Sequence, residues 1–208
     1  MPAVPARILE IGCGPVGGLV PALHAAGYTA EGVDPQAPDE PGYRQVGFED
    51  YRPPRPADAV AACTSLHHVA DLDAVLDRIR DKLAPGDTLI VVEWARERFD
   101  EPTARWCFNR PPLATDDSEA GWLHRHRHRW SDSGLPWREY LRSWATEEGL
   151  HTGEQILAGL DARFHRRMRE RGPYFFADLA DTTEAEEQAA IDNADIQANG
   201  IRYVGQPC

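Results

Sequence analysis

The chain has 208 residues and a mass of 23.2 kDa, which is the size of one ordinary domain or of one domain with a large insertion. Hydrophobic residues make up 42% of the sequence and charged residues 27%, proportions that favour a globular protein over a disordered one. The net charge of −12 argues against a nucleic-acid partner, and no apolar run reaches the roughly 18 residues of a membrane span, so we expect a soluble protein that binds neither.

The first half of the chain alternates strand patterns with helix patterns. Short apolar and β-branched runs predict strands at 7–11, 29–33, 43–46, 57–62 and 88–92. Apolar residues at helical spacing predict one helix over 19–26 and a second that Asp71 caps and Pro85 ends. Strands that alternate with crossover helices predict a parallel sheet with helices on both faces.

The second half differs in composition, because residues 94–144 hold all six tryptophans, nine arginines and eight acidic residues. The acids nearly cancel the arginines, which disfavours a nucleic-acid surface here. Capping boxes or an opening proline predict four helix starts: Asp116 with Glu119, Pro136, Thr152 with Gln155, and Thr183 with Glu186. The helix from Thr152 is expected to include Phe164, and residues 201–204 to form a final strand.

The cysteines and the beginning of the chain bear on where the protein works. The four cysteines lie far apart without metal-ligand or redox spacing: Cys13, Cys63, Cys107 and Cys208. The start MPAVPAR passes directly into an apolar run, so we read no export signal and expect a cytoplasmic protein with free thiols. His124 and His128 would share a helix face, but no acid or cysteine pattern joins them, so we expect no metal site.

A glycine-rich loop follows the first predicted strand. The run from Glu10 to Gly17 contains G-x-G-x-x-G between a strand and a helix, and Asp34 ends the next strand, 22 residues after Gly12. Glycines let the chain turn tightly beside a ligand, and the acid accepts hydrogen bonds from ribose hydroxyls. The loop predicts an adenosine-bearing cofactor, and the carboxylate of Glu10 favours a cationic one over a pyrophosphate.

The run from Glu10 to Gly17 resembles motif I of class I S-adenosylmethionine-dependent methyltransferases, E/D-x-G-x-G-x-G, with either Pro15 or Val16 inserted. Residues 58–69, which contain Leu-His-His, resemble the segment after the fourth strand of small-molecule members, and 83–87 resemble the turn before the fifth. The resemblance covers residues 6–93. It implies one α/β domain over 1–208, with a Rossmann-like, doubly wound, seven-stranded and mostly parallel sheet, an antiparallel last strand and a helical lid insertion.

The resemblance also implies S-adenosylmethionine as the cofactor and a set of residues around it. Asp34 matches the ribose-binding acid, and Phe48 and Glu49 fall where the family lines its adenine pocket. The expected cofactor-binding residues are Glu10, Gly12, Cys13, Gly14, Gly17, Asp34, Pro35, Phe48, Glu49, Cys63, Thr64 and Ser65.

His67 and His68 are the candidate catalytic residues. Methyl transfer is an in-line displacement, so catalysis consists mostly of alignment in a dry pocket. An imidazole could remove a proton from a neutral alcohol or amine near neutral pH, whereas a phenol or carboxylate acceptor needs little help. The structural alternative is that one histidine packs under the sheet and the other bonds backbone at a helix start. We expect transfer to oxygen or nitrogen of a small molecule.

The acceptor site is expected to come from two segments, 94–135 and 165–200. Many relatives cover the active site with helices before motif I, but here the first strand begins about six residues after Met1. An aromatic-lined pocket suits a sulfonium whose charge disperses. The expected pocket residues are Trp94, Trp106, Phe108, Trp122, His126, Trp130 and Tyr174.

Two other functions share parts of this pattern. A nicotinamide oxidoreductase has the same glycine fingerprint, although the short-chain type needs Tyr-x-x-x-Lys and the sole lysine, Lys82, follows Arg78 at that spacing. A non-catalytic regulatory protein would bind S-adenosylmethionine without turnover. Both a monomer and a homodimer agree with the sequence.

Overall fold

The computed structural model describes residues 2–53, 55–111 and 121–208. The chain divides into two compact units. The sheet unit consists of Met1–Glu93, His151–Glu170 and Ile201–Cys208, and the helical unit of Trp94–Leu150 and Arg171–Gly200.

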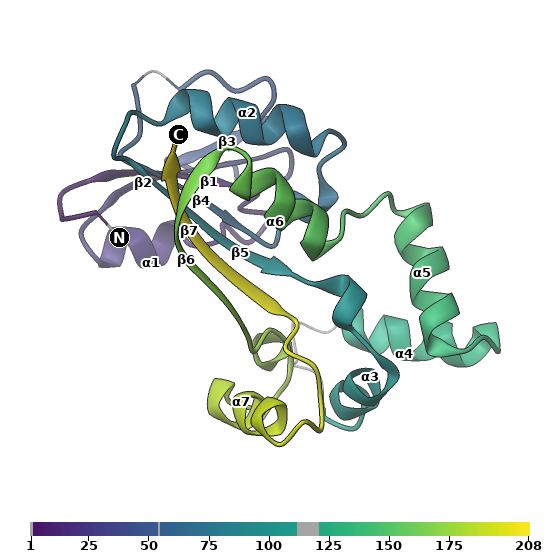
Figure 1. The fold of residues 1–208 in the computed structure, drawn as a ribbon. Helices are drawn as coiled ribbons and strands as arrows, with labels where there is room; N and C mark the ends of the chain where they lie inside the picture. Colours follow the sequence, from purple (N-terminus) through teal and green to yellow (C-terminus); the bar gives the residue numbers. More distant parts are fainter. Residues whose placement is uncertain (1, 54, 112–120) are drawn as a thin grey trace. The chain divides into compact units, whose positions relative to one another are not determined.

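Seven strands form one sheet in the order β3-β2-β1-β4-β5-β7-β6 (Figure 1). Six strands are parallel, and the last strand in the chain runs antiparallel between β5 and β6. The bounds are β1 (Arg7–Ile11), β2 (Thr29–Asp34), β3 (Tyr43–Gln45), β4 (Ala59–Cys63), β5 (Thr88–Trp94), β6 (Phe164–Gly172) and β7 (Gly200–Pro207). The predicted seven-stranded sheet with an antiparallel last strand is therefore confirmed.

β1 is an interior strand between β2 and β4, and three of its five residues are buried apolar ones, as expected for a parallel strand covered on both faces. Ile8, Leu9 and Ile11 are buried, and β1 pairs in parallel with β2 and β4. In this register Glu10 lies opposite Gly32 on one side and Ala61 on the other. The strand order reverses between β1 and β4, and such a switch point is where ligands bind in open α/β sheets.

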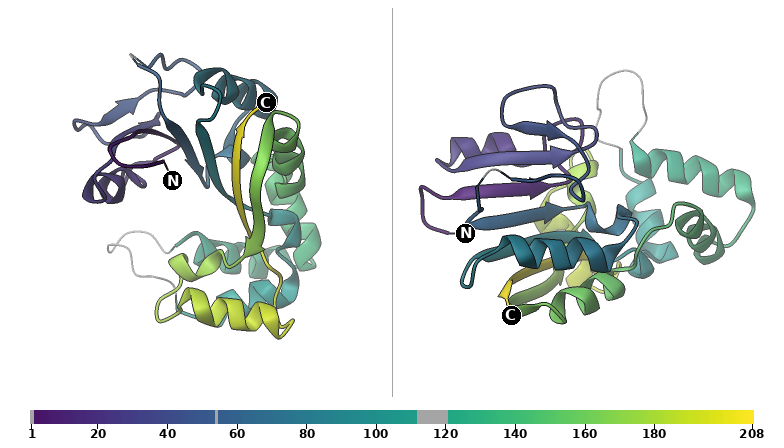
Figure 2. Two further views of the ribbon diagram at one scale, coloured as in Figure 1. Left: turned by 60° about the vertical axis from the view of Figure 1, so that its left-hand side comes forward. Right: turned by 90° about the horizontal axis from the view of Figure 1, so that it is seen from above.

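Helices cover both faces of the sheet, with α1 on one face and α2 and α6 on the other (Figures 1 and 2). Their bounds are α1 (Val20–Ala25), α2 (Leu72–Lys82) and α6 (Gly153–Asp161), and a short 3₁₀ turn, η1 (Leu66–His68), follows β4. As predicted, the Asp71 side chain caps α2 by accepting a hydrogen bond from the Ala74 N–H, and Thr152 with Gln155 forms a capping box on α6.

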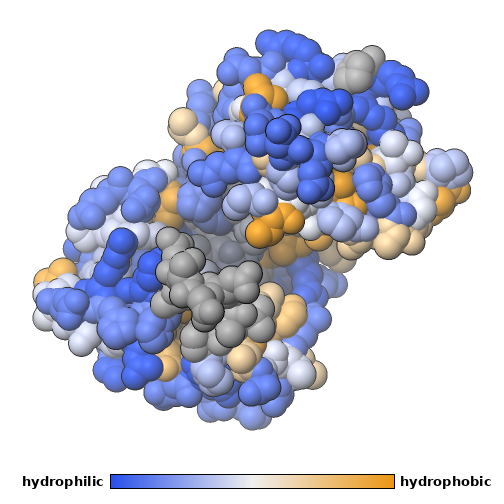
Figure 3. Space-filling model, turned by 180° about the vertical axis from the view of Figure 1, so that it is seen from behind, coloured by the Kyte–Doolittle hydropathy of each residue, from blue (hydrophilic) through white to orange (hydrophobic). Residues whose placement is uncertain are grey.

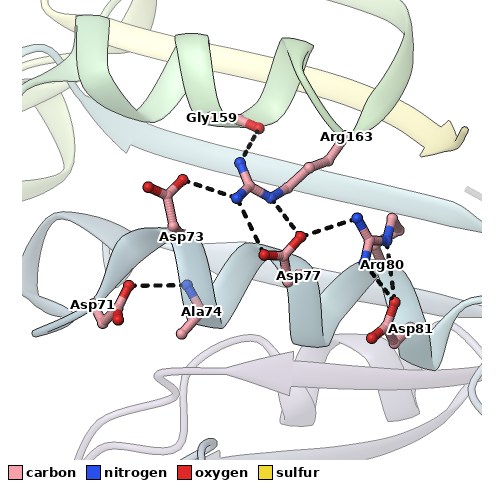
Figure 4. A network of polar contacts seen from close by, with 8 residues as sticks. All are labelled: Asp71, Asp73, Ala74, Asp77, Arg80, Asp81, Gly159 and Arg163. Carbon is pink, nitrogen blue, oxygen red and sulfur yellow. Dashed lines mark hydrogen bonds and ion pairs between the residues drawn. The ribbon is translucent and has the colours of Figure 1, made fainter.

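Arg163, which follows α6, ties that helix to α2 (Figure 4). Its guanidinium lies 2.9 Å from a carboxylate oxygen of Asp77 and 2.9 Å from one of Asp73. It also donates a hydrogen bond of 3.2 Å to the Gly159 carbonyl. The side chain is largely buried while both carboxylates are more exposed, so the network holds the two helices together at their solvent-facing edge.

Replacing Arg163 by methionine is expected to lower the Tm by about 2–4 °C. A single surface ion pair stabilises a protein weakly, but the several ion pairs of a network together give a measurable stabilisation. Arg163 lowers the pKa of Asp77, so this stabilisation is present above the ordinary aspartate pKa of 3.8 and is lost as the pH falls below it. Thermal denaturation at pH 7 and pH 3 measures the difference. Arg166→Met, which removes a more exposed arginine paired with Asp161, is the matched control and should change the Tm less; equal shifts for the two variants would contradict the network.

The helical unit is built around aromatic side chains. Its helices are α3 (Glu101–Phe108), α4 (Trp122–Ser133), α5 (Trp137–Glu147) and α7 (Glu184–Asp192), with 3₁₀ turns η2 (Arg96–Arg98) and η3 (Phe175–Asp178). Thr183 and Glu186 form the predicted capping box on α7, and α5 begins directly after Pro136. The predicted capping box at 116–119 lies outside the described residues; α4 itself begins after Gly121.

The expectation that the helix from Thr152 includes Phe164 was wrong, because Phe164–Gly172 form the edge strand β6. The sequence FHRRMRERG has no apolar alternation, and most of its side chains are exposed. An edge strand pairs on one side only, so its backbone bonding to β7 outweighs its weak strand pattern.

The face of the molecule in Figure 3 is mostly hydrophilic, with hydrophobic residues in patches among the hydrophilic ones. Among the described residues, the large hydrophobic side chains that are exposed are Val4, Val16, Leu19 and Leu135. None of the helices in the described part of the chain has the length and apolar character needed to cross a membrane.

Candidate cofactor site

A cavity of about 700 Å³ lies in the sheet unit, beside the carboxyl ends of β1, β2 and β4. This volume falls within the range of about 300–1,000 Å³ that small-molecule sites occupy. The cavity brings together eleven of the twelve expected cofactor residues and one of the two candidate histidines: Glu10, Gly12, Cys13, Gly14, Asp34, Pro35, Phe48, Glu49, Cys63, Thr64, Ser65 and His68. Gly17 and His67 are not among the residues that line it.

Gly12 and Gly14 make the glycine loop possible. Both have positive φ, +76° and +62°, which strongly favours glycine. A Cβ on Gly12 would lie 2.2 Å from Cβ of Ser65, whereas a Cβ on Gly14 would meet nothing within 4 Å. Gly12 is therefore fixed by close packing against the turn after β4, and Gly14 leaves open space beside the backbone for a ligand.

Gly17, the third glycine of the motif, lies outside the cavity lining. A Cβ on Gly17 would lie 2.4 Å from the Tyr43 hydroxyl, so this residue packs against β3 instead of lining the cavity. Gly18 lines the cavity, and a Cβ there would lie 2.4 Å from a carboxylate oxygen of Glu10. Because the loop is one residue longer than the family pattern, the glycine that lies close to the Glu10 carboxylate is Gly18, one residue later than expected.

Glu10 is 1% exposed and holds the start of α1. Both of its carboxylate oxygens accept hydrogen bonds from the Leu19 N–H, at 2.8 and 3.0 Å. Burial raises its pKa to about 7, although the hydrogen bonds from the backbone of Leu19 and Val20 act in the opposite direction. A positive charge in the cavity would favour the ionised carboxylate.

Asp34 and Phe48 lie at the other strand ends. Asp34 ends β2, and one of its oxygens accepts a hydrogen bond of 2.7 Å from the Gln36 N–H. Phe48 is buried, and Arg78 of α2 holds its loop by donating to the Phe48 carbonyl at 2.9 Å while lying over the ring. The loop that carries Phe48 and Glu49 is thus anchored to α2.

The two candidate histidines have different surroundings. His68 lines the cavity. His67 is buried, and its Nδ1 lies 2.7 Å from a carboxylate oxygen of Glu93. The centroids of the two rings are 4.2 Å apart, so His68, which lines the cavity, packs against His67, which is held in the interior.

Sequence reasoning missed Glu93, a fully buried carboxylate near the carboxyl end of β5. Its second oxygen accepts hydrogen bonds from the Ser65 and Leu66 N–H groups, at 2.8 and 2.6 Å. The signal was present, because a single acid in the apolar run TLIVVEW must find partners once the strand is buried.

The charges of the cavity decide which cofactor fits. Its described lining includes three carboxylates, on Glu10, Asp34 and Glu49, and neither lysine nor arginine. Such a lining would repel a diphosphate, whereas S-adenosylmethionine brings a sulfonium and an ammonium group. The residues therefore fit a cationic adenosine cofactor, and Gly14 leaves space for it.

The sequence matches the family described as "Methyltransferase domain" over residues 2–150. The chain belongs to this family. With this membership the fold, the enzyme class and the cofactor are those of an S-adenosylmethionine-dependent methyltransferase. The nicotinamide oxidoreductase alternative is set aside.

Solved structures of methyltransferases share the fold. One is an S-adenosylmethionine dependent methyltransferase from Mesorhizobium loti (17% identity, TM-score 0.58, 99% of this chain and 93% of that chain). A second is the N-methyltransferase NodS from Bradyrhizobium japonicum WM9 with S-adenosyl-L-homocysteine (12%, 0.52, 97% and 78%). A third is geranyl diphosphate C-methyltransferase from Streptomyces coelicolor A3(2) (13%, 0.50, 98% and 74%). No curated protein matches the sequence.

The two cysteines of the methyltransferase's cavity are poor nucleophiles. Burial, with the nearby carboxylate of Glu10, raises the pKa of Cys13 to about 11 and that of Cys63 to about 12. Both thiols are therefore protonated at neutral pH and serve as small packing groups.

The residues expected to line the methyltransferase's acceptor pocket gather in the aromatic core of the helical unit. Trp94 stacks on Tyr174 with ring centroids 6.1 Å apart, and Nδ1 of His126 lies 2.6 Å from the Tyr140 hydroxyl. Trp94, Phe108 and His126 are buried, whereas Trp106, Trp122, Trp130 and Tyr174 are partly exposed. All seven have a packing role, and a contact with the acceptor remains a prediction.

Burial lowers the pKa of His126 to about 4, with contributions from Arg129 and Arg125. The ring is therefore neutral at physiological pH and sits as a hydrogen-bonded core residue. His124 and His128 face each other with their Nε2 atoms 2.9 Å apart. The described residues contain no group of three or more metal-ligating side chains.

Proposed function

We propose that this methyltransferase transfers a methyl group to an oxygen or nitrogen atom of a small-molecule acceptor, with His68 as the base. The observation that carries the proposal is the position of His68, the one imidazole in the described lining of the acid-rich cavity. S-adenosylmethionine supplies an electrophilic methyl group when bound. The residues of the chain have to bind the cofactor and the acceptor, align the two, and remove a proton from the acceptor.

The cavity residues divide this work between them. Asp34 would hold the ribose and Glu10 the cationic amino-acid end, because each presents a carboxylate at the end of a strand. Cys13, Cys63 and Val69 provide apolar lining, which disfavours water near the reacting atoms. His68 would accept the proton of a neutral alcohol or amine as its lone pair attacks.

A small acceptor is favoured by the size of the cavity and by the related structures. The cavity of about 700 Å³ must hold the cofactor, which leaves little space for a large group. NodS is named an N-methyltransferase, and the Streptomyces coelicolor enzyme was crystallised with geranyl diphosphate. The first name states transfer to nitrogen, and the second states transfer to carbon of a small molecule, each in that protein.

The function is tested by binding and then by turnover. Calorimetry should show micromolar binding of S-adenosylmethionine and S-adenosylhomocysteine but no binding of NAD. A panel of phenols, alcohols, amines and carboxylic acids is then screened for formation of S-adenosylhomocysteine. Binding without turnover of any of them would favour the regulatory alternative, and binding of NAD alone would reject the proposal.

His68→Ala is expected to lower kcat by about 100-fold for an alcohol or amine acceptor, because these need a general base. For a phenol or carboxylate the loss should be under about tenfold, since a base adds little there. Steady-state kinetics on both acceptor types measure this difference. His165→Ala, an exposed histidine on β6, is the matched control; an equal loss on all acceptors would remove the role of base from His68.

A further inference from the structure

The carboxylate of Glu93 holds three consecutive residues of the turn after β4. One oxygen accepts hydrogen bonds from the Ser65 and Leu66 N–H groups, at 2.8 and 2.6 Å, and the other lies 2.7 Å from Nδ1 of His67. The glutamate is 0% exposed, so these bonds form in a low-dielectric interior. Hydrogen bonds to a charged acceptor are roughly twice as strong as neutral ones.

The turn that Glu93 holds is strained and forms a wall of the cofactor cavity. Thr64 has φ of +52°, the left-handed region that favours glycine. Ser65 connects the turn to β1 by donating a hydrogen bond of 3.0 Å from its hydroxyl to the Ile11 carbonyl. Thr64, Ser65 and His68 all line the cavity. A strained turn persists only where its surroundings hold it, and Glu93 provides three of these contacts.

We propose that Glu93 is a positioning residue: its buried carboxylate fixes the Thr64–His68 turn against the cofactor cavity and thereby places His68. The role of His68 in this statement rests on the proposed function. Glu93 does not line the cavity itself, so it acts through the turn and through His67.

The same contact sets the tautomer of His67. A carboxylate accepts only, so the hydrogen between the two groups lies on Nδ1. In Glu93→Gln, the amide oxygen would still accept from Ser65 and Leu66, while the amide nitrogen would donate to Nδ1 and move the ring hydrogen to Nε2. In Glu93→Ala the backbone contacts and the imidazole contact are all lost. The pair of variants separates the backbone contacts from the imidazole contact.

The test combines calorimetry with S-adenosylhomocysteine and NMR of the histidine ring nitrogens and of the backbone amides. Glu93→Ala should bind S-adenosylhomocysteine at least about 30-fold more weakly, and its Ser65 and Leu66 amides should exchange at least about tenfold faster. Glu93→Gln should lose only about three- to tenfold in affinity, because a neutral acceptor replaces a charged one, and should show the inverted tautomer of His67. Glu31→Gln is the matched control, since Glu31 is also buried and ion-paired in the sheet unit but does not line the cavity; its affinity should be unchanged.

Each outcome bears on one proposal. Wild-type affinity in Glu93→Ala, or unchanged affinity and an unchanged His67 tautomer in Glu93→Gln, overturns the positioning role while leaving methyl transfer intact. If Glu93→Ala does not fold, Glu93→Gln decides alone. Failure of the wild-type chain to bind S-adenosylhomocysteine would instead reject the proposed function, and the amide exchange, which needs no cofactor, would still decide whether Glu93 fixes the turn.

Discussion

Gly12→Ala is expected to lower the affinity for S-adenosylhomocysteine by at least about 100-fold, because the new methyl group cannot be placed without moving the wall of the cavity. The Cβ would lie 2.2 Å from Cβ of Ser65, at a φ of +76°. Ser65 cannot move away freely, since its backbone is bonded to Glu93 and its hydroxyl to the Ile11 carbonyl. The strain and the collision together should also destabilise the fold by about 2 kcal/mol or more.

Calorimetry and urea denaturation measure the two effects of Gly12→Ala, and Gly86→Ala is the control. Gly86 also has positive φ, +96°, but a Cβ there would meet nothing within 4 Å, and it lies in the turn before β5. This control should cost about 1 kcal/mol of backbone strain and leave the affinity unchanged. Equal affinity in the Gly12 variant and the wild type would show that the turn after β4 does not shape the site.

The fold was predictable where burial controls the sequence. The central strands β1, β4 and β5 are covered on both faces, so their apolar runs had to appear in the sequence. β6 was not predictable in this way, because an exposed edge strand has no need of an apolar pattern. Its place is fixed by pairing with β7, which the local sequence does not record.

The cofactor residues were predictable because parallel strands end at the same edge of the sheet. Glu10, Asp34 and Cys63 occupy the ends of β1, β2 and β4, and that topology alone brings them to one cavity. The turns that follow the strands were harder, since one residue of loop length decides whether Gly17 or Gly18 approaches Glu10. In the same way, the sequence His67-His68 does not reveal which ring points into the cavity.

The aromatic segment shows a further limit of composition. Tryptophans next to arginines were expected to form an acceptor pocket, and the structure gives them the core of the helical unit. A unit of this size buries large rings to gain apolar area, so aromatic richness by itself predicts packing as readily as binding. The partly exposed members, such as Trp122 and Trp130, are the ones whose contact with an acceptor is worth testing.

Glu10 is expected to make cofactor binding depend on pH. Its pKa of about 7 in the free chain means that the carboxylate is mostly protonated below pH 7. A cationic cofactor binds the ionised form better, so binding releases a proton and the affinity should rise about tenfold per pH unit up to pH 7 and then level off. The stability of the fold depends on pH in the opposite direction. Because the pKa of Glu10 is raised, Glu10 stabilises the folded chain below the ordinary glutamate pKa of 4.5, and this contribution is lost as the pH rises to about 7.

Glu10→Gln separates the two effects, because the amide oxygen keeps an acceptor for the Leu19 N–H but carries no charge. The variant should bind S-adenosylmethionine about 30- to 100-fold more weakly at pH 8 and show no rise in affinity between pH 5 and 7. Calorimetry in buffers of different ionisation enthalpy measures the proton that the wild type releases and the variant does not. A wild-type pH profile in Glu10→Gln would mean that another group titrates, and the carboxylate at the end of β1 would then serve only to hold the start of α1.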